Sequence, residues 1–123
     1  MEPSDLKLVW STLIPYTKED LEKFKLDGVE GVYRISKKET DGKFYVVLIG
    51  SALNLKTELL RIIDENTPFQ MYYTQGGDFS FRFAPVGGED TRKAVEKQMY
   101  KQYAPLFNNA EPNSSLDTKV NLN

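Results

Sequence analysis

The 123-residue chain contains no cysteine and no histidine. These two absences exclude disulfides, thiolate nucleophiles, zinc sites built from cysteine and histidine, and acid–base catalysis by imidazole. The chain also lacks an excess of positive charge, because 18 acidic residues stand against 16 basic ones and the net charge is -2. Binding to a polyanion would therefore depend on a local basic patch.

Long hydrophobic runs are absent as well. No apolar stretch approaches the roughly 20 residues that a membrane-spanning helix requires, and the start "MEPSDLKLVW" lacks the basic and apolar parts of a signal peptide. We therefore expect an intracellular protein, cytoplasmic by default, with no membrane partner. The 40% hydrophobic content predicts a single domain over residues 1–109 with an N-terminal helical extension. A polar, loosely ordered tail is expected over residues 110–123.

The spacing of apolar residues predicts an alternation of helices and strands. Helices are expected over residues 18–26, from just after Gly50 to about Glu65, and over Glu89–Tyr103. Strands are expected over Gly31–Lys38, Lys43–Gly50 and Phe79–Val86, and the turn "ETDG" makes the first two a hairpin. This order predicts an α+β fold with a small, mostly antiparallel three-stranded sheet flanked by helices.

Two of the expected strands carry further information. The second is apolar at every position from Phe44 to Ile49, which predicts a central strand covered on both faces. In the third, alternation places Phe79, Phe81 and Phe83 on one face and Arg82 on the other. The aromatic stretch "PFQMYYTQGGDF" before it is expected to be a loop whose tyrosines pack on the sheet or form a contact surface.

Five short segments follow one another in an informative order. They are "GVY" at 31–33, "LIG" at 48–50, "SALNLKTELL" at 51–60, "RFAPV" at 82–86 and "APLFN" at 104–108. Together they resemble the GIY-YIG nucleases, a family named for two tripeptides on adjacent strands. The resemblance covers about Gly31 to Asn108 and implies a GIY-YIG-like fold and phosphodiester hydrolysis with Mg²⁺ or Mn²⁺. It also implies catalytic roles for Tyr33 and Asn108 and a metal-binding role for Glu96.

Two positions depart from that family. Leu48 replaces the tyrosine of the second tripeptide, and Glu58 stands eight residues after Gly50, where cutting members carry an arginine that contacts the scissile phosphate. Phosphodiester cleavage requires positive charge to meet the charge that develops on the phosphoryl oxygens. A carboxylate at 4 Å would instead repel the substrate by about 1 kcal/mol in water and about 4 kcal/mol at an intermediate dielectric. Glu58 therefore predicts the loss of ordinary cleavage.

Three compensations for these departures remain open. Arg61 follows Glu58 by three residues, so it could pair with that carboxylate or supply the missing cation itself. Glu58 could join Glu96 as a metal ligand, since two carboxylates suit Mg²⁺ or Mn²⁺. Tyr45 could replace the tyrosine lost at Leu48, but strand alternation over three residues predicts opposite faces for the two side chains.

The candidate residues also have ordinary structural explanations. Tyr33 is a residue type that packs well in strands, and Asn108 is of a type that often caps a chain end. Gly50 is explained by backbone geometry at a strand-to-helix passage. Glu96 fits a solvated helix face beside basic neighbours.

Basic residues form a stripe on the last expected helix. Lys93, Lys97 and Lys101 recur every four residues, and Arg82 and Arg92 are predicted nearby. Such a stripe usually serves solubility, but it is also the kind of local patch that contacts phosphates.

Two functional hypotheses follow. The favoured one is a binding module for nucleic acid or for a protein partner that has lost ordinary phosphodiester cleavage. The alternative is a divalent-metal-dependent DNA endonuclease with a rearranged active site, in which Tyr33, Arg61 and Glu96 carry the reaction.

Overall fold

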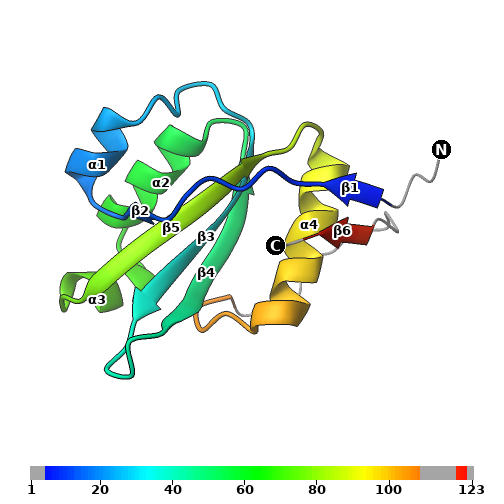
Figure 1. The fold of residues 1–123 in the computed structure, drawn as a ribbon. Coiled ribbons are helices and arrows are strands. Elements are labelled where there is room, and N and C mark those ends of the chain that lie inside the picture. Colours follow the sequence, from blue (N-terminus) through cyan, green and yellow to red (C-terminus); the bar gives the residue numbers. More distant parts are fainter. Residues whose placement is uncertain (1–4, 109–118, 122–123) are drawn as a thin grey trace.

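A computed structural model describes residues 5–108 and 119–121 of the chain (Figure 1). Its elements are β1 (Asp5–Lys7), β2 (Ile14–Pro15), α1 (Lys18–Lys23), β3 (Gly31–Lys38), β4 (Phe44–Ala52), α2 (Leu55–Asp64), α3 (Pro68–Thr74), β5 (Asp78–Pro85), α4 (Glu89–Tyr103) and β6 (Lys119–Asn121). The α+β class and the antiparallel sheet flanked by helices are confirmed. None of the described helices is both long and apolar enough to cross a membrane.

The main sheet has four strands in the order β2-β5-β3-β4, rather than the three that were expected. The additional strand, β2, pairs antiparallel with β5 through only two residues, Ile14 and Pro15. Proline cannot donate a ladder hydrogen bond and is confined to strand edges, so this segment carries no strand signal in the sequence. β5 and β3 are the interior strands and β4 lies at an edge, so the prediction that β4 is central was wrong.

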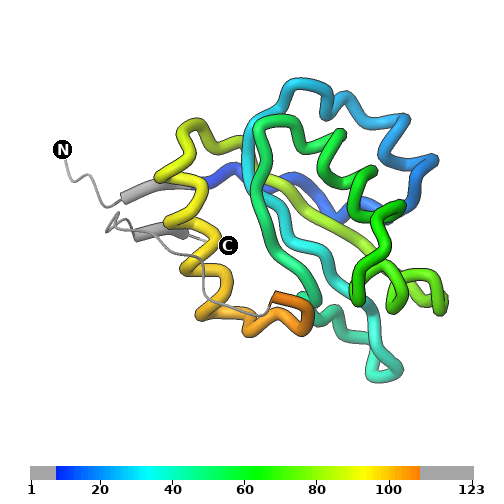
Figure 2. The backbone as a smooth tube through the Cα atoms, turned by 180° about the vertical axis from the view of Figure 1, so that it is seen from behind, coloured from blue at the N-terminus to red at the C-terminus, as the bar shows by residue number. Residues whose placement is uncertain are grey.

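Helices cover both faces of the sheet. α1, α2 and α3 lie on one face and α4 lies on the other, as the two opposite views show (Figures 1 and 2). Each face has its own buried cluster, one containing Tyr33, Ile35 and Phe81 and the other containing Val32, Ile49 and Val95. β4 is an edge strand that contacts both α2 and α4, which explains its continuous apolar pattern.

Capping residues and apolar spacing predicted two of the four described helices, α2 and α4, correctly. α2 begins after Asn54, whose side chain accepts a hydrogen bond from the Thr57 amide at 3.3 Å, and α4 has the predicted bounds. α1 ends at Lys23, earlier than expected. The stretch expected to be an aromatic loop is largely the helix α3, capped by Thr67 and started by Pro68.

The pairing of β3 with β4 contains a bulge. Ile35 lies opposite Leu48 and Ser36 lies opposite Val46, so Val47 is an extra residue on β4. Val47 and Leu48 both pack against the cluster under α1, α2 and α3. The alternation of faces along β4 is therefore shifted by one residue at this point.

The bulge changes the expected position of Tyr45. Tyr45 lies opposite Lys37, whose Nζ is 4.6 Å from the centre of the Tyr72 ring on the α3 side of the sheet. Tyr45 and Leu48 therefore share a face, and the prediction of opposite faces was wrong. The Tyr45 hydroxyl nevertheless donates to Asp41 Oδ2 at 2.5 Å, in the hairpin turn, so it does not fill the place of the lost tyrosine.

Gly50 is required for space. A Cβ at this position would lie 2.2 Å from Tyr33 Oη and 2.5 Å from Tyr33 Cζ. Gly50 lies inside β4 and is not among the residues with positive φ. The explanation from backbone geometry was therefore wrong, because the requirement comes from the Tyr33 ring that packs across the glycine.

The predicted polar tail is described only in part. Residues 110–118 and 122–123 lie outside the described residues. Lys119–Asn121 form β6, which pairs in parallel with β1 beside α4 (Figure 1).

The contact between Gly50 and Tyr33 predicts a large effect of one added methyl group. Gly50→Ala should lower the free energy of unfolding by about 1–3 kcal/mol because the Cβ overlaps the Tyr33 phenol. Gly87→Ala is the matched control, since nothing lies within 4 Å of its added Cβ. Chemical denaturation of both variants measures the difference, and equal stability of the two would contradict this account.

Candidate functional site

Tyr33 is the buried centre of the candidate site. Its side chain projects from β3 over Gly50, and the residue is only 3% exposed. Burial raises the pKa of the Tyr33 phenol well above its usual range, and the negative charges of Glu58 and Glu96 raise it further, while Arg61 acts in the opposite direction. Side chains from β3, α2 and α4 are thus close enough to act on one phenol. Tyr33 remains protonated at neutral pH.

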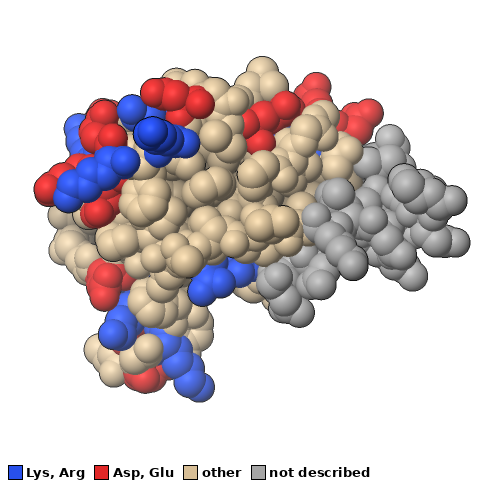
Figure 3. All heavy atoms as spheres, turned by 45° about the horizontal axis from the view of Figure 1, so that its top comes forward, with Lys and Arg blue, Asp and Glu red and all other residues tan. Residues whose placement is uncertain are grey.

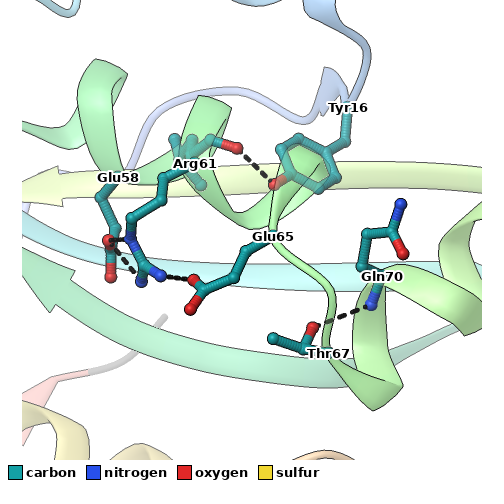
Figure 4. A network of polar contacts seen from close by, with 7 residues as sticks. Tyr16, Glu58, Arg61, Glu65, Thr67 and Gln70 are labelled. Atoms are coloured by element: carbon teal, nitrogen blue, oxygen red, sulfur yellow. Dashed lines mark hydrogen bonds and ion pairs between the residues drawn. The ribbon is translucent and has the colours of Figure 1, made fainter.

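Glu58 and Arg61 form a pair on α2. Arg61 Nε donates to Glu58 Oε1 at 2.7 Å, and Arg61 Nη2 lies 2.7 Å from the same oxygen. Arg61 Nη1 also contacts the carboxylate of Glu65, one turn further along the helix. Figure 4 shows the guanidinium between the two carboxylates. Of the alternatives open for Arg61, the structure contains the pairing with Glu58.

Glu96 approaches the same place from α4. Burial raises the pKa of the Glu96 carboxyl, and the negative charge of Glu58 adds to this, while the Ser51 hydroxyl, Arg92 and Lys93 lower it. Glu58 and Glu96 therefore lie close enough to influence each other. The site thus contains the carboxylates of Glu58 on α2 and of Glu96 on α4. Arg61 contacts Glu58 and also a third carboxylate, that of Glu65.

The oxygen atoms at this place suit a hard divalent cation. Mg²⁺ is commonly bound through one or two carboxylates while it keeps several waters, and Glu96 and Glu58 are of that type. The raised pKa of Glu96 is consistent with a carboxylate whose charge the protein leaves partly uncompensated. The described residues contain no group of three or more acidic ligands. The fit is therefore to a sparse, water-rich site rather than to an all-protein cage.

A hollow of about 370 Å³ opens beside Tyr33. Its wall includes Leu48, Phe69 and Phe107, and Arg61 and Glu65 line it as well. Leu48 contributes an apolar surface at the position of the second-tripeptide tyrosine. The wall consequently lacks the hydroxyl that a tyrosine would bring there.

Asn108 is engaged with the edge of the sheet. Its Oδ1 accepts a hydrogen bond from the Ile49 amide at 2.8 Å, and its Nδ2 donates to the Ile49 carbonyl at 3.0 Å. The Phe107 amide donates to the Val47 carbonyl at 2.9 Å. These bonds satisfy backbone groups that the edge strand β4 would otherwise leave open. The Asn108 side chain is therefore bound to the backbone of the residue that precedes Gly50.

The predicted basic residues do not all lie on one exposed surface, although Lys93, Lys97 and Lys101 do recur along α4. Arg92 is buried, its guanidinium contacts the Glu30 carboxylate, and Glu30 Oε2 also accepts from the Gly88 amide at 3.0 Å. This ion pair holds the start of α4 against the loop before β3, which removes Arg92 from the exposed basic surface. Lys93 pairs with Glu89 at 3.2 Å. Figure 3 shows acidic and basic side chains intermixed at the α1 end of the visible face, without a broad basic area.

Arg82 lies elsewhere. As predicted, it is on the opposite face of β5 from Phe79 and Phe81, and it is the direct cross-strand partner of Arg34. Lys97 is partly buried on α4. The structure therefore places Arg61 in the wall of the hollow beside Tyr33, and the charge of Glu96 acts on the Tyr33 phenol. Arg82 and Arg92 do not line that hollow.

Two residues of the site were missed from the sequence. Tyr16 is buried, donates to the Leu59 carbonyl at 2.7 Å and interacts electrostatically with Tyr33. No local signal marks it, because it follows the two-residue strand β2. Glu65 could have been found, since it follows Arg61 by four residues on one helix face.

Comparisons with known proteins show the fold. No protein-family model and no curated protein matches the chain. Solved structures of the GIY-YIG N-terminal endonuclease domain of UvrC from Thermotoga maritima do match. The magnesium-bound form has a TM-score of 0.58 and 22% identity, over 75% of this chain and 99% of that chain. A point mutant bound to its catalytic divalent cation has a TM-score of 0.60 and 21% identity, over 76% and 100%.

At this level of identity the likeness concerns the arrangement of the backbone. It extends over most of the chain and all or nearly all of the bacterial domain. The chain therefore has a GIY-YIG-like fold, as its two tripeptides and the segments that follow them predict.

Proposed function

We propose that this GIY-YIG-like domain has lost ordinary phosphodiester cleavage and acts as a binding module for nucleic acid or for a protein partner. The observation that carries the proposal is the position of Glu58. Its carboxylate holds Arg61, and its negative charge acts on Tyr33 and, more weakly, on Glu96. At the position where cutting members of the family present a positive charge to the phosphate, this chain therefore carries the negative charge of Glu58.

The charges around Tyr33 support this proposal. A phosphodiester entering beside Tyr33 would approach Glu58 and Glu96, and the cation that acts on Tyr33, Arg61, is already bound by two carboxylates. A repulsion of about 4 kcal/mol at an intermediate dielectric would weaken transition-state binding about a thousandfold. A divalent cation bound at Glu96 would supply Lewis acidity and positive charge. That charge would have to offset Glu58 before it could stabilise a substrate.

The state of Tyr33 points in the same direction. Burial and two neighbouring carboxylates disfavour the phenolate, so the Tyr33 hydroxyl is a poor proton acceptor at neutral pH. Leu48 provides no second hydroxyl in the wall of the hollow. Neither of the two tyrosine positions thus offers an activated oxygen.

The intact scaffold favours retained binding. Gly50, Tyr33 and the Asn108 contacts keep the nuclease-like architecture in place, and a hollow lined by both apolar and charged side chains lies beside Tyr33. The solved structures with this fold are endonuclease domains, which makes nucleic acid the first ligand to test. Binding that uses phosphate contacts should weaken steeply as salt is raised.

The first prediction concerns activity. Purified protein incubated with supercoiled or branched DNA and Mg²⁺ or Mn²⁺ should produce no more nicked product than the Glu96→Ala variant. The physical reason is that a carboxylate, Glu58, stands where a cation is needed, while Arg61 is already held by Glu58 and Glu65. Robust cutting that disappears in Glu96→Ala would overturn the proposal. That result would favour the metal-dependent endonuclease that uses Tyr33, Arg61 and Glu96.

The second prediction concerns charge reversal in the site. Glu58→Arg should tighten binding of a labelled DNA duplex at low salt about tenfold or more, because a repulsive charge becomes attractive. Glu58→Gln should have an intermediate effect. Glu39→Arg makes the same change of charge at an exposed position between β3 and β4 and is the matched control. Fluorescence anisotropy measures the affinities, and equal effects of Glu58→Arg and Glu39→Arg would show that position 58 has no special access to phosphate.

A further inference from the structure

The hollow of about 370 Å³ in the candidate site brings apolar and charged side chains together. Leu48, Phe69 and Phe107 supply apolar surface, and Arg61 and Glu65 add one positive and one negative group. Pockets for small organic groups commonly combine apolar walls, which give contact area, with a few polar groups that fix the orientation of the ligand. The wall of this hollow therefore suits a flat organic group with hydrogen-bonding edges.

The Tyr33 hydroxyl belongs to a side chain of this wall and has no protein partner. Tyr33 lines the hollow and is only 3% exposed. Among the described residues, no hydrogen bond involves its hydroxyl. The hydroxyl is also not one of the described side-chain atoms that are both unpartnered and sealed from solvent, so it keeps a small accessible surface. Because the large majority of buried polar side-chain atoms have a partner, this one points to a ligand atom in the hollow.

Arg61 and Glu65 place a donor and an acceptor side by side. Arg61 lies between the carboxylates of Glu58 and Glu65 (Figure 4). A guanidinium has five N–H groups and a carboxylate about four lone-pair positions, so these contacts leave capacity on both groups for a ligand. The edges of nucleobases carry N–H donors next to carbonyl and ring-nitrogen acceptors. Such an edge matches the two side chains in hydrogen-bonding character.

A phosphate matches the same wall less well. Arg61 is a positive group of the wall, but two carboxylates already hold it. The negative charge of Glu58 acts on Tyr33 and would oppose a phosphoryl group there, whereas a neutral base carries no such penalty. Leu48 favours the base as well, since it leaves an apolar surface in the wall where the GIY-YIG family has a tyrosine.

We propose that the hollow beside Tyr33 binds an unpaired nucleobase. The base packs against the apolar wall, accepts hydrogen bonds from Tyr33 and Arg61, and donates to Glu65. Proteins hold unstacked bases by this combination of aromatic or apolar contact with hydrogen bonds to the base edge. The inference rests on the proposed function and deepens it, because the neutral base enters the hollow while the phosphates of the nucleic acid stay outside. The base can belong to a strand or to a free nucleoside.

The first experiment isolates one base. Fluorescence anisotropy is measured with a labelled strand of abasic nucleotides that carries a single base at its centre, and with the same strand without that base. Both strands carry the same phosphates, so their electrostatic attraction is matched. At least one of the four bases, each tested in turn, should tighten binding about tenfold or more. In a second arm, each free nucleoside is added to the full chain, and the backbone amides of Leu48 and Phe69 are followed in ¹H–¹⁵N NMR spectra.

Two variants test the polar groups. Tyr33→Phe keeps the ring and should weaken base binding about fivefold. It should not lower the midpoint of chemical denaturation, because the hydroxyl has no partner among the described residues. Tyr100→Phe removes a hydroxyl on the α4 face of the sheet and is the matched control. Glu65→Gln, at an exposed position, replaces an acceptor by an amide and should change the ranking of the four bases.

The outcomes separate the two sources of the base and the two proposals. Tighter binding of the one-base strand identifies a strand as the ligand, and amide shifts by a nucleoside with equal binding of the two strands identify a free nucleoside. The inference is overturned if the strands bind equally and no nucleoside shifts these amides, or if Tyr33→Phe binds its ligand like Tyr100→Phe. Equal binding of both strands would still leave nucleic-acid binding through phosphates standing. Cutting of intact DNA would overturn the proposed function but not the base site.

Discussion

The packing of the Tyr33 ring across Gly50 is the contact on which the rest of the site depends. It joins β3 to β4 within a sheet that α2 covers on one face and α4 covers on the other (Figure 1). Only glycine leaves room for the phenol, and only the antiparallel register brings these residues opposite each other. Once that contact exists, Glu58 and Glu96 are carried to the same place by helices that the core requires in any case.

Architecture and charge are separable in this protein. The buried clusters, the glycine contacts and the Asn108 bridge to Ile49 maintain a GIY-YIG-like fold, and none of them depends on the charge at position 58. Glu58 gives the region around Tyr33 a negative character and holds Arg61 in an ion pair. The fold and the charge near Tyr33 therefore depend on different residues.

Local sequence patterns correctly predicted those features that depend on residues close together in the chain. Capping residues and apolar spacing placed α2 and α4, and the spacing of Glu58 and Arg61 allowed for their pairing. Features that depend on distant segments were missed or wrong, including the short strand β2, the edge position of β4 and the bulge at Val47. The burial of Arg92 depends on Glu30, which arrives from another part of the chain. The convergence of Glu58 with Glu96 likewise required the fold.

The central claim is that the negative charge of Glu58 acts on Tyr33 and on Glu96 and so contributes to the charge of the site. It is tested most directly by measuring the pKa of the Glu96 carboxyl with ¹³C NMR in the wild type and in Glu58→Gln, with Glu65→Gln as the control. The account predicts a wild-type pKa above the usual range of glutamate, because of burial and Glu58, and a lower pKa in Glu58→Gln but not in Glu65→Gln. A Glu96 pKa that is ordinary in the wild type, or that is unchanged in Glu58→Gln, would contradict it.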